Sequence, residues 1–264
     1  MRLEFCTIAS GSSGNCAYVG TEHTKLLIDA GISGKKIEQG LADLKLEGSQ
    51  IDGLLITHEH TDHIKGAGIF SRRFDVPIYA TADTWAAMGD SIGKIAPGNK
   101  RILYADEMCA INDICVKPFA IPHDAAEPVG YSLFTGEKKI TFATDIGHVT
   151  DTLKEQMEDS DILLLEANHD IEMLKRGRYP YHLKQRILGE NGHLSNRAAG
   201  ELLAEVLTGK MKYVFLGHLS DENNTPHLAY ETVEEILRKH RIEVGTHIRM
   251  DLANRYHNGL LVEL

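Results

Sequence analysis

The sequence predicts an α/β fold formed by one domain over residues 1–264. Its 264 residues suit one large domain, and a composition of 42% apolar and 25% charged residues is typical of globular proteins rather than of disordered, collagen-like or coiled-coil chains. Short apolar runs alternate with helix-like windows throughout, as in α/β proteins. No long Pro/Gly/Ser linker and no internal repeat interrupts the alternation.

Apolar runs bounded by turn residues predict the strands. In chain order these are Leu3–Ala9, Ala17–Gly20, Lys25–Asp29, Gly53–Thr57, Ile78–Ala80, Ile114–Ile121, Gly130–Phe134, Lys139–Thr144, Ile162–Glu166, Tyr213–Leu216 and His247–Leu252. Windows with helical periodicity predict helices at Ser33–Leu44, His63–Arg73, Ala82–Gly89, Val149–Glu158, Ser195–Leu207 and Pro226–Lys239. Ser33, Thr81 and Ser195 are suitable N-caps, and Pro226 is tolerated in a first helical turn.

The charge balance limits the classes of partner. Lys and Arg number 28 against 38 Asp and Glu, so the formal net charge is −10. This argues against a generally basic nucleic-acid coat, but it leaves open a local basic patch or bound cations that reverse the local sign. The 14 histidines, the commonest side-chain metal ligands, raise the question of an organised site.

Other sequence features suggest an ordinary cytoplasmic protein. The four cysteines, Cys6, Cys16, Cys109 and Cys115, include no C-x-x-C pair and are expected to be buried thiols. The N-terminal residues do not form a signal peptide, and the longest apolar stretches are too short to cross a bilayer. The expected location is therefore the cytoplasm, without membrane contact, and the sequence leaves the oligomeric state open.

The segment with the clearest chemistry is Leu54-Leu55-Ile56-Thr57-His58-Glu59-His60-Thr61-Asp62-His63. An apolar strand ends there and is followed at once by three imidazoles and a carboxylate. The spacing of His58 and His60 points both rings to one side of an extended segment. Asp62 and His63 follow as the chain enters a helix, where they can face a second ion. Imidazole with carboxylate suits Zn, Mn or Fe, so the segment predicts a metal site.

This motif resembles the metallo-β-lactamase fold superfamily, and the resemblance covers nearly the whole chain. Its other marks recur in order, each after an apolar strand: Asp29, His123 in Ile121-Pro122-His123, Asp145 in Phe142-Ala143-Thr144-Asp145, and His218 in Phe215-Leu216-Gly217-His218. The resemblance implies a four-layer αββα sandwich. It also implies two divalent metal ions per chain, either Zn, Mn or Fe.

The resemblance assigns a role to each of these residues. His58, His60 and His123 would hold one ion, Asp62, His63 and His218 the other, and Asp145 would bridge them. Asp29 would hydrogen-bond a ligand imidazole and fix its tautomer. Two such ions would make the site positive overall, which suits an anionic substrate. A metal pair of this kind can hydrolyse amides, thioesters or phosphodiesters, so other residues must select the reaction.

Asp145 argues against lactamase activity, and two further motifs favour phosphodiesters. Resemblance associates Asp145 with phosphodiesterase and thioesterase-like branches, because true lactamases have Cys there. Glu166 in Leu165-Glu166-Ala167-Asn168-His169 and His193 in Asn191-Gly192-His193-Leu194-Ser195 resemble motifs of the tRNA 3′-processing endonuclease branch. They imply Glu166 as an orienting carboxylate and His193 as the general acid for the leaving oxygen, completing a catalytic set with Asp62 and Asp29.

Two segments are candidates for substrate contact. Ser10, Ser12, Ser13 and Asn15 form a small-residue loop that can bind phosphate, although a simple hairpin turn is the alternative. The run Lys175–Arg197 is the densest basic segment and is expected to line the track of the DNA substrate that family resemblance implies, with a solvated face as the alternative. Its cations are Arg176, Arg178, Lys184, Arg186 and Arg197. Tyr179 and Tyr181 lie between them and could stack on a base, with core or surface packing as the alternative.

Together these motifs resemble the YycJ/WalJ-like bacterial subfamily. That resemblance implies a cytoplasmic phosphodiesterase with 5′-to-3′ exonuclease action on double-stranded DNA. One alternative is an RNA nuclease, or a phosphodiesterase for cyclic or other small substrates, using the same site. The other is a glyoxalase-type thioester hydrolase, in which Glu166 and His193 would have no catalytic role. A redox or binding protein with an iron pair is disfavoured because it would usually need a flavin module. A purely structural metal site is disfavoured because such a site would be closed and tetrahedral.

Overall fold

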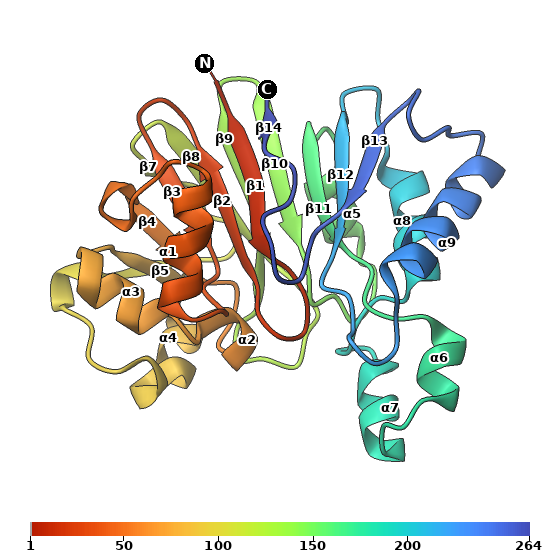
Figure 1. The fold of residues 1–264 in the computed structure, drawn as a ribbon, viewed down its shortest axis with the longest axis horizontal. Coiled ribbons are helices and arrows are strands. Elements are labelled where there is room, and N and C mark those ends of the chain that lie inside the picture. The colour runs from red at the N-terminus through yellow and green to blue at the C-terminus, as the bar shows by residue number, and fades with distance from the viewer. Residues whose placement is uncertain (1) are drawn as a thin grey trace.

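The computed structural model describes residues 2–264, whose strands form two seven-stranded sheets (Figure 1). The first sheet has the strand order β14-β1-β2-β3-β4-β5-β6 and the second β13-β12-β11-β10-β9-β8-β7. The first consists of β1 (Glu4–Ala9), β2 (Cys16–Gly20), β3 (Lys25–Ile28), β4 (Gly53–Leu55), β5 (Ile78–Thr81), β6 (Lys100–Leu103) and β14 (Val262–Glu263). The second consists of β7 (Cys109–Ile111), β8 (Ile114–Ala120), β9 (Val129–Thr135), β10 (Lys138–Ala143), β11 (Ile162–Glu166), β12 (Tyr213–Gly217) and β13 (Arg249–Leu252).

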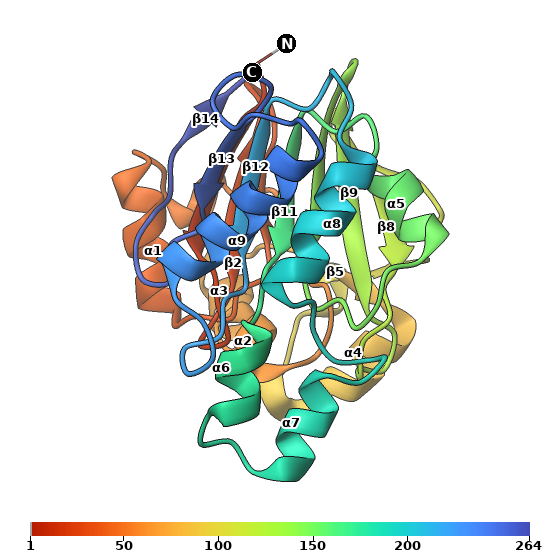
Figure 2. The same ribbon diagram turned by 90° about the vertical axis from the view of Figure 1, so that its right-hand side faces the viewer.

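Helices cover the outer face of each sheet. The first sheet packs against α1 (Gly34–Asp43), α3 (Ala67–Phe74) and α4 (Ala82–Met88), and the second against α5 (Asp151–Met157), α8 (Asn196–Val206) and α9 (Pro226–Lys239) (Figures 1 and 2). The other helices are α2 (Thr61–Ile64), α6 (Ile171–Arg176) and α7 (Tyr181–Ile187), with short 3₁₀ turns at Gly48–Gln50, Gly89–Ile92 and Pro97–Asn99. Within residues 2–264, each helix is too short or too polar to span a membrane.

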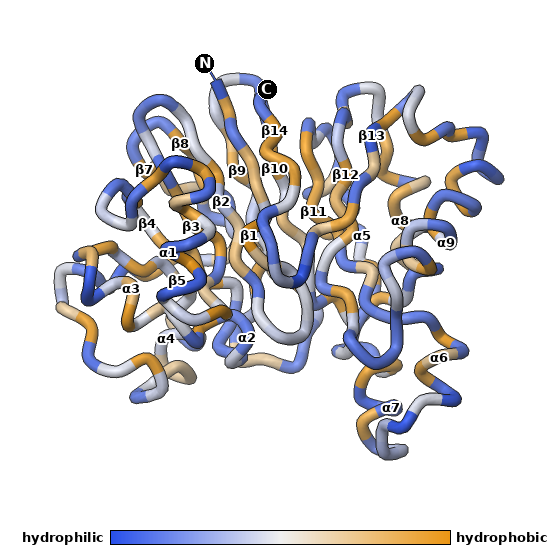
Figure 3. Tube along the Cα trace, viewed as in Figure 1, coloured by the Kyte–Doolittle hydropathy of each residue, from blue (hydrophilic) through white to orange (hydrophobic). Residues whose placement is uncertain are grey.

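Side-chain alternation along the strands builds the layers. In β1, Cys6 and Ile8 pack toward the helices, whereas Phe5 joins the core between the sheets, where its ring lies 5.0 Å from that of Phe215. The hydrophobic strands at the centre are visible in Figure 3. The three apolar layers that result confirm the predicted four-layer αββα sandwich.

Strand direction brings the site residues together. β3 and β4 are parallel, and so are β10, β11 and β12. The carboxyl ends of parallel strands lie at one edge of a sheet, which is where α/β proteins place ligand sites. The segments that follow β3, β4, β10, β11 and β12 therefore meet at one end of the sandwich.

The structure differs from the sequence prediction at several elements. The predicted helix His63–Arg73 is two helices, α2 and α3, separated at Gly66, where a Cβ would lie 2.3 Å from the Ile32 carbonyl oxygen. β4 ends at Leu55 instead of Thr57, and β13 begins at Arg249 instead of His247. The prediction lacked β6, β7, β14, α6 and α7. These are short elements, and β6 exposes three of its four residues, so their hydrophobic patterns are weak.

Candidate metal centre

The histidine motif lies in a tight connection between β4 and α2. His58 is fully buried below the end of β4, and His60 is the N-cap residue of α2. The four-residue helix then turns Asp62 and buried His63 toward the same region. His58 Nε2 lies 3.0 Å from His60 Nδ1, so the two rings converge on one point.

Three imidazoles form the first candidate ligand cluster. One ligand atom each from His58, His60 and His123 lies within 4.8 Å of the others. His123, which follows β8, places its Nε2 3.4 Å from His60 Nδ1. Burial, together with neighbouring imidazoles, lowers the pKa of His58 well below its ordinary value, which favours the neutral form that binds metals.

Asp62, His63 and His218 form the second cluster, again with ligand atoms within 4.8 Å. The carboxylate Oδ2 of Asp62 lies 3.5 Å from His63 Nε2 and 3.4 Å from His218 Nε2. His218 comes from the turn after β12 and is buried.

Asp145 lies between the two clusters. Its Oδ2 is 3.4 Å from His63 Nε2 and its Oδ1 is 3.8 Å from His123 Nε2. This carboxylate is buried, and Oδ2 has no hydrogen-bond partner among the described residues. A divalent ion would compensate this buried anionic oxygen, and the imidazole and carboxylate donors around it are of the kinds that fit such an ion.

Three residues of this region adopt a left-handed backbone conformation. The φ angles are 59° at Asp29, 61° at Asp145 and 55° at His218, each just beyond a strand. Non-glycine residues rarely adopt this conformation, and such residues concentrate at functional sites. The turn after each strand aims the side chain across the end of the sandwich.

Asp29 lies behind the second cluster. Its Oδ2 accepts a hydrogen bond from His63 Nδ1 at 2.7 Å, and its Oδ1 accepts one from the Thr57 backbone N–H at 2.9 Å. With Nδ1 as the donor, the neutral form of the His63 ring carries its lone pair on Nε2, the nitrogen that faces Asp62 and Asp145.

Glu166 holds two imidazoles at once. Its Oε1 lies 2.8 Å from His193 Nδ1 and 2.9 Å from His218 Nδ1, while Oε2 accepts backbone hydrogen bonds from Ile146 and Leu194. The carboxylate is fully buried. Burial would raise its pKa, but the neighbouring histidines outweigh burial and hold the pKa below its ordinary value.

His193 lies between the rings of His123 and His218, at centroid distances of 5.1 and 5.3 Å. Burial would lower the pKa of its imidazole, but the charge and hydrogen bond of Glu166 raise it above its ordinary value. Nδ1 is held by Glu166, and Nε2 has no hydrogen-bond partner in the described part of the chain. That nitrogen can exchange a proton with a bound group.

The Gly/Ser loop divides into a buried base and an exposed tip. The Ser10 hydroxyl accepts a hydrogen bond from the His218 backbone N–H at 2.9 Å, and Asn15 donates from its backbone N–H to the Asp62 carbonyl at 2.8 Å. Both side chains are buried, and the phosphate contact expected of Ser10 and Asn15 stays a prediction. Ser12 and Ser13 are exposed at the tip and remain available to a substrate.

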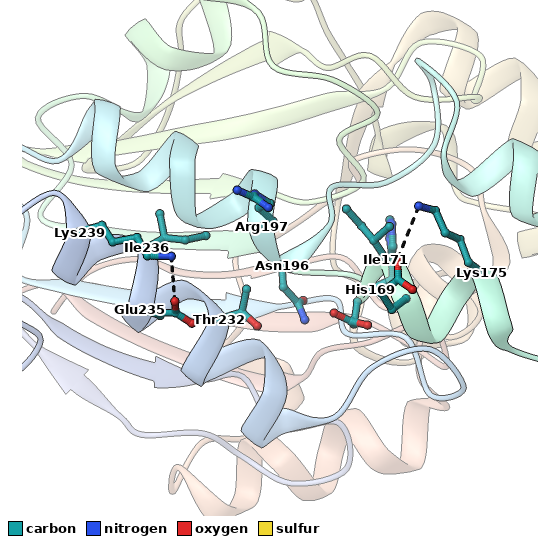
Figure 4. Close-up of a pocket in the computed structure, with 11 residues that line it drawn as sticks. His169, Ile171, Lys175, Asn196, Arg197, Thr232, Glu235, Ile236 and Lys239 are labelled. Carbon is teal, nitrogen blue, oxygen red and sulfur yellow. Dashed lines mark ion pairs between the residues drawn. The ribbon is translucent and has the colours of Figure 1, made fainter.

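The predicted basic residues are divided between different surroundings. Lys175 and Arg197, the two ends of the basic run, line one pocket of about 490 Å³ between α6, the start of α8 and α9, together with Lys239 (Figure 4). Arg178 is exposed in the connection between α6 and α7. The Lys184 ammonium donates to the carbonyls of Lys175 and Gly177, so it stabilises that connection instead of facing a partner.

The sequence did not single out two charged side chains that the structure places near the centre. Asp124, next to His123, has its Oδ1 3.5 Å from His123 Nε2 and pairs with Arg186 of α7. The Arg255 guanidinium donates to the Leu219 carbonyl at 2.6 Å and to the Ser12 hydroxyl at 3.4 Å. The Asp124–Arg186 pair spans 62 residues of sequence, so no local pattern could reveal it. For Asp124, adjacency to His123 was the one available signal.

Comparison with known proteins agrees with this geometry. The sequence profile of the Beta-lactamase superfamily domain matches residues 24–218. Exodeoxyribonuclease YycJ of Bacillus anthracis is 42% identical over 245 residues, which cover 93% of each chain. Exodeoxyribonuclease WalJ of Streptococcus pneumoniae is 40% identical over 250 residues, covering 94% of this chain and 93% of its own.

A solved structure independently supports the fold. The crystal structure of the metallo-β-lactamase fold protein YhfI from Bacillus subtilis matches with a TM-score of 0.73 at 14% identity, and the match covers all of both chains. The chain therefore belongs to the β-lactamase superfamily, with the metallo-β-lactamase fold, and within it to the family represented by YycJ and WalJ.

Proposed function

We propose that this protein is a metal-dependent nuclease that hydrolyses DNA phosphodiesters, acting as a 5′-to-3′ exonuclease on double-stranded DNA. The observation that carries the proposal is the position of Asp145, a buried carboxylate between two His/Asp clusters and beside the Glu166–His193 pair. The exodeoxyribonuclease names of YycJ and WalJ support DNA as the substrate. An enzyme with that substrate would work in the cytoplasm.

The proposed ligand sets follow the two clusters. His58, His60 and His123 would hold one divalent ion and Asp62, His63 and His218 a second, with Asp145 as a ligand available to both. Zn, Mn and Fe all suit this donor set. When bound, a metal pair supplies an activated water and neutralises charge on the phosphate. Asp29 keeps the His63 ring in the tautomer and orientation that ligation needs.

The remaining residues act on the proton and the substrate. Glu166 holds His193 through Nδ1, which leaves Nε2 to protonate the departing oxygen as a general acid. Ser12 and Ser13 at the exposed loop tip contact a phosphate, with Arg178 and Arg197 as more distant contacts for the nucleic acid.

The test is a substrate panel with the metal-loaded protein. Labelled linear duplex, single-stranded DNA, RNA and a thioester are compared with added Mn or Zn. We expect end-dependent duplex degradation that Asp145→Asn abolishes and that His193→Ala slows by about 10²-fold or more. Asp251→Asn, at an exposed carboxylate on β13, is the matched control. Thioester hydrolysis without turnover of any nucleic acid would refute the proposal.

A further inference from the structure

Residues 171–188 form a two-helix hairpin, α6 and α7, that projects beyond the end of the sandwich where the metal centre lies (Figures 1 and 2). Its charge is opposite to that of the chain. Between Glu172 and Glu190 the sequence carries five Lys or Arg and no acidic residue, in a protein of net charge −10. A polyanion is the partner that such a segment attracts.

Two cations of the hairpin keep guanidinium nitrogens without a partner among residues 2–264: Arg178 entirely, and Arg186 at its two terminal nitrogens. Lys175 and Arg176 pair with Glu172 at 3.6 and 3.2 Å, and Lys184 stabilises the connection between the helices. Arg178 and Arg186 are left to face a partner. The Arg186 side chain is 55% exposed even though one of its nitrogens is engaged.

Arg186 is fixed at the rim of the metal centre. Its Nε donates to the Asp124 carboxylate, whose other oxygen lies 3.5 Å from Nε2 of His123. Its two terminal nitrogens have no hydrogen-bond partner among residues 2–264. A guanidinium held through Nε presents a planar pair of donors that matches the oxygens of a phosphate.

The exposed face of α7 continues outward from Arg186. Leu183, Lys184 and Ile187 form its buried or half-buried side, whereas Tyr181, His182, Gln185 and Arg186 are exposed. Tyr181, at the far end of the helix, is 77% exposed. An aromatic ring presented to solvent beside cations is the arrangement that stacks on nucleobases.

On the basis of the nuclease function proposed above, we propose that the exposed face of α7 receives the substrate strand. Arg186 binds a backbone phosphate next to the metal centre, and Tyr181 stacks on a base farther along the strand. Tyr181 and Arg186 are five positions apart on the helix, which is about 7.5 Å along its axis. This equals about two steps of a DNA strand at about 3.4 Å each.

The experiment compares two substrates of the metal-loaded protein, linear duplex DNA and bis(p-nitrophenyl) phosphate. The second contains the scissile diester but no neighbouring phosphate or base. We expect Tyr181→Ala to lower kcat/KM on DNA about 5- to 100-fold, and at least fivefold more than on the small diester. Tyr181→Phe, which keeps the ring, should restore DNA cleavage. Tyr104→Ala, at an exposed tyrosine between β6 and β7, is the matched control.

Arg186 is tested by salt dependence. We expect Arg186→Met to weaken DNA binding and to reduce the slope of log affinity against log salt concentration by about one. Arg241→Met, at an exposed arginine after α9, should leave the slope unchanged.

Three results would overturn the inference: wild-type DNA cleavage by Tyr181→Ala, equal losses on both substrates, or an unchanged slope in Arg186→Met. Hydrolysis of neither substrate by the wild type would instead refute the nuclease proposal.

Discussion

At the scale of single residues, Glu166 depends on the hydrogen-bond donors around its buried carboxylate. Its carboxylate accepts four hydrogen bonds while fully buried, two from imidazoles and two from backbone N–H groups. Glu166→Gln replaces one carboxylate oxygen by an NH₂ group. This hydrogen-bond donor would then face other donors, either the Nδ1–H groups of His193 and His218 or the two backbone N–H groups. We expect about 1.5–3 kcal/mol of lost stability, measured by urea unfolding, and about 10²-fold lower kcat.

The control for this substitution is Glu234→Gln on α9. Glu234 is in an ion pair with Arg238 at 3.1 Å on the helix surface. Exposed pairs contribute little, so this variant should stay within about 0.5 kcal/mol of the wild type. If Glu166→Gln behaved in the same way, the carboxylate would not be orienting the imidazoles.

His169 gives the chain a pH dependence separate from the metal ligands. Burial lowers the pKa of this imidazole to about 4, and neither ring nitrogen has a hydrogen-bond partner among the described residues. As the pH falls, the His169 imidazole is therefore protonated at a higher pH in the unfolded chain than in the folded chain. Its contribution to stability is complete above about pH 6.5 and is lost as the pH falls toward about 4.

We expect acidification to about pH 5 to cost the wild type about 2 kcal/mol more than His169→Gln, because glutamine does not titrate. Urea unfolding of the metal-free proteins at about pH 7.5 and about pH 5 measures the difference. Equal losses in the two proteins would show that His169 is not held neutral by the fold.

At the scale of elements, the loop between β1 and β2 depends on Gly14. Its φ angle is 152°, and a Cβ there would lie 2.6 Å from the Ile32 side chain and 2.7 Å from the Gly31 carbonyl oxygen. Gly14→Ala would push the loop away from the Asp62 turn. We expect about 1–3 kcal/mol of lost stability and weaker metal binding, measured by unfolding and by metal titration.

Gly98→Ala is the matched substitution, since a Cβ there meets nothing within 4 Å. It should change neither stability nor metal affinity. An equally harmless Gly14→Ala would mean that the loop can move without disturbing Asp62.

Element patterns also show what the sequence could predict. Buried strands such as β11, with five buried residues, and long helices with a cap and an apolar stripe, such as α9, were predictable from local pattern. The break at Gly66 was not, because it depends on the Ile32 carbonyl, which belongs to another segment. The sequence showed the α6–α7 hairpin only as a basic run, because its helices of six and seven residues are too short to give a clear helical periodicity.

At the scale of the whole molecule, the candidate centre joins turns from both sheets. The sequence could identify its histidines and carboxylates because each follows an apolar strand and the motifs occur in family order. It could not show that Ser10 and Asn15 face inward or that Arg197 lines another pocket. Those outcomes depend on long-range contacts such as Ser10 with His218, 208 residues apart.

Because the ligands come from both sheets, metal binding should stabilise the sandwich as a unit. Asp62 and His63 follow β4 of one sheet, whereas Asp145 and His218 follow β10 and β12 of the other. An ion that binds only the folded chain adds about 2.7 kcal/mol at a hundredfold excess over Kd. For a protein of this size, that raises Tm by about 5–10 °C.

Thermal unfolding after chelation and after titration with Mn or Zn measures this shift. Asp145→Asn should reduce the shift by more than half, because it removes the carboxylate between the clusters, whereas Asp251→Asn should keep it. A wild-type Tm that does not change between chelated and metal-loaded protein would contradict the metal centre. A full shift in Asp145→Asn would contradict only the bridging role, since the two clusters would then bind their ions independently of that carboxylate.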